Sequence, residues 1–293
     1  MHDGLFFDLS ARTKIRVTGQ DRQRYLNGQL TNDVRKATES EAIAACILNA
    51  KGKMDAHAMV ASDGEAFMLD ADPVLRETLP SRLERYVIAD DVILEDVTER
   101  LSILHVIGAA LPELPNCRTI AANRFGEAGK DLWMEASVRD ETFARLAETI
   151  SFCDEAQAEV FRIEQGIPRW GAELTADVIP PEAGLESNSV DYGKGCYIGQ
   201  EVISRMKMSG QRNKALCGLV SDSPLGAGMR LQNDEGKEVG WITSAARSKR
   251  VGGEMALGYV KRGFNAAGTQ LKVVAAEGTI GVEIVDLPFK VGE

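Results

Sequence analysis

Residues 191–205 contain the most chemically distinctive group of side chains in this 293-residue chain. A single cysteine, Cys196, lies among three glycines, Gly193, Gly195 and Gly199. Glycine lets the backbone adopt positive φ or approach a ligand closely, so the segment predicts a bent loop. Lys194 lies two residues before the sulfur, and positive charge near a thiol favours the nucleophilic thiolate. The pattern therefore predicts a catalytic thiol at Cys196, assisted by Lys194.

A second interpretation of the same cysteine is structural. Cysteine is one of the most often buried residues and frequently acts as a small apolar filler. In that case the rest of the motif would only shape a loop. The motif residues in question are Gly195, Tyr197, Gly199, Gln200, Glu201 and Arg205.

The overall charge argues against a nucleic-acid-binding protein, because the formal net charge is −10. Residues 194–214 and 245–262 are exceptions, since each carries five basic residues and one acidic residue. Two basic patches on an acidic chain favour a small polyanionic ligand or an acidic protein partner. Either patch alone is also compatible with an ordinary solvated surface.

The cysteines and histidines give no metal-site or disulfide pattern. The five cysteines are widely spaced without a C-x-x-C pair, and none of the three histidines has a ligand spacing. No apolar run is long enough to span a membrane, and an acid, Asp3, stands where a signal peptide has its basic start. We expect a cytoplasmic protein with no metal of its own and no membrane partner.

The chain that must position this motif has an α+β pattern over residues 1–212. Alternating or apolar runs predict strands at 13–18, 42–48 and 54–60, with a hairpin turn at 49–52. Residues 109–130 contain two prolines and are expected to be mostly loop. From residue 213 to 293, six short strand patterns separated by turn residues predict a small antiparallel β-barrel. We expect a ligand cleft between these two domains.

A helix predicted over 154–165 ends at Gly166 and places Glu164 in its last turn, with Arg162 beside it. A carboxylate there could accept the paired N–H donors of a heteroaromatic ring. An ordinary surface glutamate near a helix end is the alternative.

Together these stretches resemble the YgfZ-type folate-binding family, which is related to the glycine-cleavage aminomethyltransferase. The specific match is Lys194-Gly-Cys-Tyr-Ile-Gly-Gln-Glu201 with Arg205. Weaker matches occur in the expected order along nearly the whole chain. They are Tyr25-Leu-Asn-Gly-Gln-Leu-Thr-Asn-Asp33, Leu48-Asn-Ala-Lys-Gly52, Arg162-Ile-Glu-Gln-Gly-Ile-Pro168, Pro180-Pro-Glu182, Gly240-Trp-Ile-Thr-Ser244 and Ala256-Leu-Gly258.

The resemblance implies an aminomethyltransferase-like fold of three lobes around a central hole that holds tetrahydrofolate. Glu164 would then meet the pterin, with Arg162 and Asn27 as further folate-binding residues. We assign the glutamate tail of the folate to Arg205 and Arg247, because guanidinium groups pair well with carboxylates.

The chain departs from the transferase where that enzyme carries a Gly-Gly-Val-Ile-Asp-Asp type sequence. Aligning on Asn-Ala-x-Gly puts Ala56 and His57 at the two aspartates. Asp55 is adjacent, but a shift of one residue in a strand points a side chain to the other face. Aminomethyl transfer is therefore not the expected activity.

The leading hypothesis is a tetrahydrofolate-binding accessory factor, not a conventional enzyme, that helps to assemble or repair iron–sulfur proteins. Its partners would be folate and iron–sulfur proteins or their assembly machinery, which is a role that the family's mitochondrial relatives imply. One alternative is a folate-dependent one-carbon transferase or demethylase. Another is a cysteine acyl transferase, which needs a histidine near Cys196.

Overall fold

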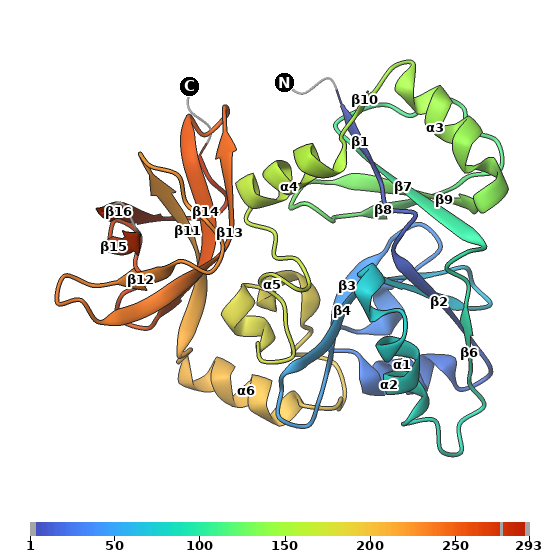
Figure 1. Cartoon of the computed structure of the whole chain (residues 1–293). Helices are drawn as coiled ribbons and strands as arrows, with labels where there is room; N and C mark the ends of the chain where they lie inside the picture. The colour runs from blue at the N-terminus through green and yellow to red at the C-terminus, as the bar shows by residue number, and fades with distance from the viewer. Residues whose placement is uncertain (1–3, 276–277, 291–293) are drawn as a thin grey trace. The chain divides into compact units, whose positions relative to one another are not determined.

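The computed structural model describes residues 4–275 and 278–290, which form two compact units (Figure 1). The first unit combines Met1–Asp154 with Glu186–Val202, and the second combines Glu155–Leu185 with Ile203–Glu293. The predicted barrel begins where expected, at Lys214, but residues 155–185 and 203–212 belong to the same unit as the barrel. Residues 1–3, on which the expected absence of a signal peptide partly rests, lie outside the described residues.

The first unit contains two five-stranded sheets. One sheet has the order β10-β1-β7-β9-β8. Its strands are β1 (Leu5–Asp8), β7 (Leu101–Ile107), β8 (Arg118–Ala122), β9 (Gly129–Glu135) and β10 (Ser151–Phe152). Residues 109–130 are mostly irregular, as expected, except for β8 and the start of β9; β8 pairs with β9 along its whole length. Strand preference depends strongly on cross-strand neighbours, and the isolated sequence of β8 does not reveal them.

The other sheet of the first unit has the order β3-β4-β5-β2-β6. Its strands are β2 (Thr13–Thr18), β3 (Ile43–Leu48), β4 (Met54–Ser62), β5 (Phe67–Ala71) and β6 (Ile93–Asp96). This arrangement confirms the three strands predicted at 13–18, 42–48 and 54–60. Buried side chains from both sheets form one apolar cluster, which includes Ala61, Met68, Ile103, Ile120 and Trp133.

Short helices complete the first unit. The α-helices are α1 (Arg22–Gln29), α2 (Thr78–Glu84), α3 (Arg139–Ala147) and α5 (Glu186–Ser189). The 3-10 helices are η1 (Val34–Lys36), η2 (Pro73–Leu75) and η3 (Ala136–Val138). A further helix, α6 (Gln200–Ser209), begins in the first unit and continues into the second.

The second unit is built on a closed six-stranded barrel of order β11-β14-β13-β12-β15-β16. Its strands are β11 (Lys214–Ser221), β12 (Arg230–Gln232), β13 (Glu238–Ser248), β14 (Gly253–Lys261), β15 (Gln270–Ala275) and β16 (Gly278–Val285). The predicted antiparallel barrel is therefore confirmed. Helix α4 (Glu155–Glu164) packs on it through Ile163, which contacts Met255 and Leu257, and η4 (Pro180–Ala183) lies against β11.

Candidate functional site

The motif loop, residues 191–199, is tied at both ends to the last turn of α1 and the residues directly after it. Near its start, the backbone N–H of Asp191 donates to the carbonyl of Thr31 over 3.0 Å. Near its end, Ile198 N–H donates to the carbonyl of Gly28 over 3.2 Å. Two stretches that lie far apart in the sequence and both match the family pattern are thus neighbours in the first unit.

Lys194 fixes the middle of the motif loop. Its buried ammonium donates to the main-chain carbonyls of Asn27, Leu30 and Asn32, at 2.6, 2.5 and 3.0 Å. These three bonds use all three N–H donors of a lysine. The last carbonyls of a helix lack partners within it, and Asn27 belongs to the last turn of α1. Burial lowers the pKa of Lys194 to about 8, so the side chain stays mostly protonated at neutral pH.

These bonds correct the role that the sequence suggested for Lys194. The side chain had been expected to assist the thiol of Cys196 directly. Its donors are committed to carbonyl oxygens, so its role in this structure is to hold the loop against α1. Asn27, which is expected to bind folate, accepts the backbone N–H of Val34 at its Oδ1 over 3.2 Å.

Some residues of the motif loop are buried and others are exposed. Lys194 and Tyr197 are buried, and the Lys194 ammonium lies 5.0 Å from the centre of the Tyr197 ring. Burial raises the pKa of the Tyr197 hydroxyl to about 12. Gly195 and Cys196 are exposed, and Cys196 is a free thiol. The burial expected of an apolar filler is therefore not observed at Cys196.

Of the three motif glycines, only Gly199 is required by backbone geometry. It has φ of +84°, and a Cβ atom there would lie 2.6 Å from the carbonyl oxygen of Asn49. In the same way, a Cβ on Gly52, at φ +74°, would lie 2.8 Å from a carbon of Val202. The β3–β4 turn thus fits closely against the start of α6. Gly195 has open space around it and no positive φ.

The remaining motif residues lie on α6, which the sequence analysis did not predict. The backbone N–H of Gln200 donates to the carbonyl of Tyr197 over 3.2 Å, which closes the turn into the helix. Glu201 and Arg205 are exposed on this helix. Arg205 belongs to the second unit, whereas the motif loop belongs to the first.

The positions that replace the transferase aspartates carry no free carboxylate. His57, on β4, places Nε2 3.1 Å from Ser189 Oγ, and burial lowers its pKa to about 4, so the ring is neutral at pH 7. Asp55 is bonded to Arg82 of α2, with Nε 2.6 Å from Oδ2. Arg82 also donates to the carbonyl of Leu48 over 2.7 Å, which ties Asp55 into the scaffold.

Glu164, the residue expected to meet the pterin, lies in the second unit and is only 7% exposed. Ser248 Oγ donates to its Oε1 over 2.5 Å, and Arg250 donates from Nη1 to Oε2 over 2.9 Å. The surface-glutamate alternative is therefore wrong. Sequence reasoning missed both partners, although Arg250 belongs to the basic segment 245–262.

Two other residues assigned to folate have structural surroundings. Arg162 is buried and bonds the carboxylates of Glu159 and Glu173 and the hydroxyl of Ser244. Its guanidinium is fully engaged, so its expected contact with folate is not supported. The Arg247 side chain is 82% exposed and lies 3.7 Å from Glu254. Successive side chains of a strand point to opposite faces, so Arg247 points away from the face where Ser248 meets Glu164.

Two general features of the described residues bear on chemistry. Residues 4–275 and 278–290 contain no cluster of three or more histidine, cysteine or acidic side chains arranged to hold a metal ion. Within the same ranges, none of the helices has the length and apolar character that crossing a membrane requires.

Comparisons with known proteins agree on one family. The model for the GCVT N-terminal domain matches residues 2–128, and the model for the glycine cleavage T-protein C-terminal barrel domain matches residues 214–290. The aminomethyltransferase T of the Bartonella henselae glycine cleavage system superposes with a TM-score of 0.88 at 19% identity. That superposition covers 99% of this chain and 87% of the other, and it confirms the expected aminomethyltransferase-like fold.

Curated relatives are more similar in sequence. A protein named tRNA-modifying protein YgfZ from Shigella boydii is 29% identical over 68% of this chain and 67% of its own length. The protein of the same name from Escherichia coli gives the same values. A chloroplastic protein of Arabidopsis thaliana, whose name classes it with transferases, is 27% identical over 96% of this chain and 70% of its own.

Proposed function

Because the chain belongs to the YgfZ-type branch of the glycine-cleavage T-protein family, we propose that it is a tetrahydrofolate-binding accessory factor for iron–sulfur proteins. It would act in the cytoplasm on the assembly or repair of such proteins, with Cys196 as its working thiol. In this proposal neither nucleic acid nor a membrane is a partner.

The observation that carries the proposal is the way in which the motif loop presents Cys196. Lys194 and Tyr197 anchor the loop, while the thiol between them is exposed. Cys46, Cys153 and Cys217 are buried, as structural cysteines usually are. A rigidly held, accessible thiol is suited to attack a sulfur species or to exchange with a client protein.

The surroundings of Glu164 support the folate part of the proposal. A pterin ring offers paired N–H donors, and an ionised carboxylate can accept both of them. Ser248 orients one carboxylate oxygen, and the ligand would share or replace the Arg250 contact at the other. The exposed Arg205 remains the proposed partner of the carboxylates of the folate tail, whereas Arg247 has less support because it points away from the Glu164 face.

A second candidate is a folate-dependent one-carbon transferase or demethylase. The printed names of the relatives favour it, since one names a transferase and others name tRNA modification. The geometry gives it less support, because Asp55 is bonded to Arg82 and His57 is a neutral side chain bonded to Ser189. The acyl transferase alternative has less support, because His105 is bonded to Asp131 and His57 to Ser189, and neither has a described contact with Cys196; His2 lies outside the described residues.

Calorimetric titration with tetrahydrofolate tests the folate-binding part. We expect saturable binding to the wild-type protein and weaker binding to Glu164→Gln. The lost charge-assisted hydrogen bond contributes about 1.5–3 kcal/mol. Glu155→Gln, at an exposed position on the same helix, is the control and should bind as the wild type does. Equal affinity of Glu164→Gln and the wild type would remove Glu164 from the site, and no binding at all would refute the folate assignment.

A further inference from the structure

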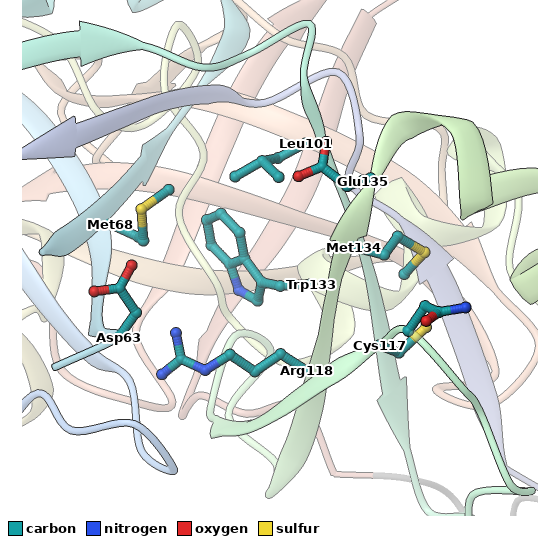
Figure 2. Close-up of a pocket in the computed structure, with 9 residues that line it drawn as sticks. Asp63, Met68, Leu101, Cys117, Arg118, Trp133, Met134 and Glu135 are labelled. Carbon is teal, nitrogen blue, oxygen red and sulfur yellow. The ribbon is translucent and has the colours of Figure 1, made fainter. Parts of the chain in front are cut away.

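A cavity of about 510 Å³ lies in the first unit, and none of its lining residues belongs to the motif loop (Figure 2). Its wall includes Asp63 from the turn after β4, Met68 of β5, Leu101 at the start of β7, Arg118 at the start of β8, and Trp133 and Glu135 of β9. Cavities of this size accommodate small organic ligands.

Trp133 gives this cavity an unsatisfied hydrogen-bond donor. The side chain is 6% exposed, and among the described residues no acceptor reaches its indole Nε1. Figure 2 shows the indole in the centre of the cavity, with its nitrogen-bearing edge turned toward Arg118. Buried N–H groups are nearly always paired, so an unpaired one facing a cavity is a donor available to a ligand that carries an acceptor.

Two opposite charges are held in place on the same side of the cavity. Arg118 donates from Nη2 to the carbonyls of Glu39 and Ser62, so its other nitrogens can still meet a ligand. Asp63 accepts the backbone N–H groups of Glu65 and Ala66 through Oδ1, which leaves Oδ2 for another donor. No described ion pair joins Arg118 to Asp63.

Aliphatic side chains and one further carboxylate line the rest of the cavity. Met68 and Leu101 flank the indole ring there, and Met68 is buried with Trp133 in the cluster between the two sheets. Glu135 lies beside Leu101, away from Arg118 (Figure 2). The end near Arg118 therefore presents a cation, an anion and an N–H donor, and the end near Leu101 presents aliphatic and aromatic carbon beside the Glu135 carboxylate.

We propose that this cavity binds a free α-amino acid with an aliphatic side chain. The carboxylate of the ligand accepts hydrogen bonds from Arg118 and from the Trp133 indole, and its ammonium donates to Asp63. Arg118 and Asp63 lie on the same side, which suits two charges carried on one α-carbon. The aliphatic side chain packs against Met68 and Leu101.

Nuclear magnetic resonance of the indole N–H groups tests this directly, because the chain has only three tryptophans. Trp133→Phe identifies the Trp133 signal by its loss. Titration with L-leucine should shift that signal and leave those of Trp170 and Trp241 unchanged. The same titration with 4-methylpentanoate, which is leucine without its amine, should require at least about tenfold more ligand, because one charge-assisted bond is missing.

Asp63→Asn tests the ammonium contact without disturbing the turn, because the amide oxygen still accepts the two backbone N–H groups. We expect this variant to bind L-leucine about tenfold more weakly and 4-methylpentanoate as before. Asp234→Asn, at an exposed position of the barrel unit, is the control and should bind as the wild type does. If millimolar L-leucine leaves the Trp133 signal unchanged, or if leucine and 4-methylpentanoate bind equally well, the proposal is wrong.

Discussion

The motif loop and the Glu164 group are both buried polar arrangements around one charged side chain, but their partners differ in kind. Lys194 is bonded to three main-chain carbonyls. Glu164 is bonded to two side chains, Ser248 and Arg250. Carbonyls fixed by the fold cannot turn away, whereas side chains can adopt other rotamers. The first arrangement is therefore suited to hold a loop rigidly, and the second can open to admit a ligand.

The largest effect is expected for Lys194→Met. The substitution keeps a long apolar side chain but leaves three inward-facing carbonyls without their donor. We expect the free energy of unfolding to fall by about 3 kcal/mol or more, because each buried unsatisfied group costs about 1–3 kcal/mol. Urea denaturation measures this loss. Lys51→Met, at an exposed position in the β3–β4 turn, is the control and should change stability by no more than about 0.5 kcal/mol. Similar midpoints for the two variants would show that Lys194 does not anchor the loop.

A smaller loss is expected for Gly199→Ala. The new Cβ would meet the Asn49 carbonyl at 2.6 Å, and alanine at φ of +84° is strained. Together these effects should cost about 1–3 kcal/mol. Gly195→Ala, four residues earlier in the same loop, meets no neighbouring atom and should cost no more than about 0.5 kcal/mol. Thermal or urea denaturation of the two variants shows whether glycine is required at position 199 alone or at both positions of the motif.

The smallest effect on stability is expected for Arg250→Met. Arg250 is about one-third exposed and Ser248 still donates to Glu164 after the substitution, so the loss should be about 1 kcal/mol, at the low end for a buried group that loses one partner. Removing it leaves Oε2 of Glu164 open to a ligand, and we expect tetrahydrofolate to bind more tightly. Denaturation and calorimetry on the same preparation measure both quantities. A marked loss of folate affinity would show instead that Arg250 contacts the ligand.

Local sequence patterns were sufficient to predict much of the scaffold. The six barrel strands and the β3–β4 hairpin follow from apolar alternation and turn residues. The motif loop up to Gly199 was also predicted. Helix α6 was not, because it begins directly after the glycine-rich motif and has no separate start signal in the sequence. Strand β8 was not predicted because its own composition does not mark it as a strand. It is stabilised by its pairing with β9.

The errors at the candidate site have one physical cause. The partners of Lys194 and Glu164 lie far away in the sequence, with 167 residues separating Lys194 from Asn27 and 86 separating Glu164 from Arg250. No local pattern records such contacts. The sequence therefore identified the charged residues but assigned Lys194 to the nearby thiol and overlooked Arg250.

The central claim is that Cys196 acts through its sulfur on a loop that other residues hold in place. The most direct measurement is the activity of an iron–sulfur enzyme in cells whose own copy of this protein has been deleted and replaced by Cys196→Ser at normal expression. We expect folding and folate binding to stay near wild type, because oxygen is close in size to sulfur and Cys196 makes no core contact, while the enzyme activity is lost. Cys217→Ser, which alters a buried barrel cysteine, should retain activity in proportion to the folded protein. Full rescue by Cys196→Ser would contradict the claim and leave the motif as a structural loop.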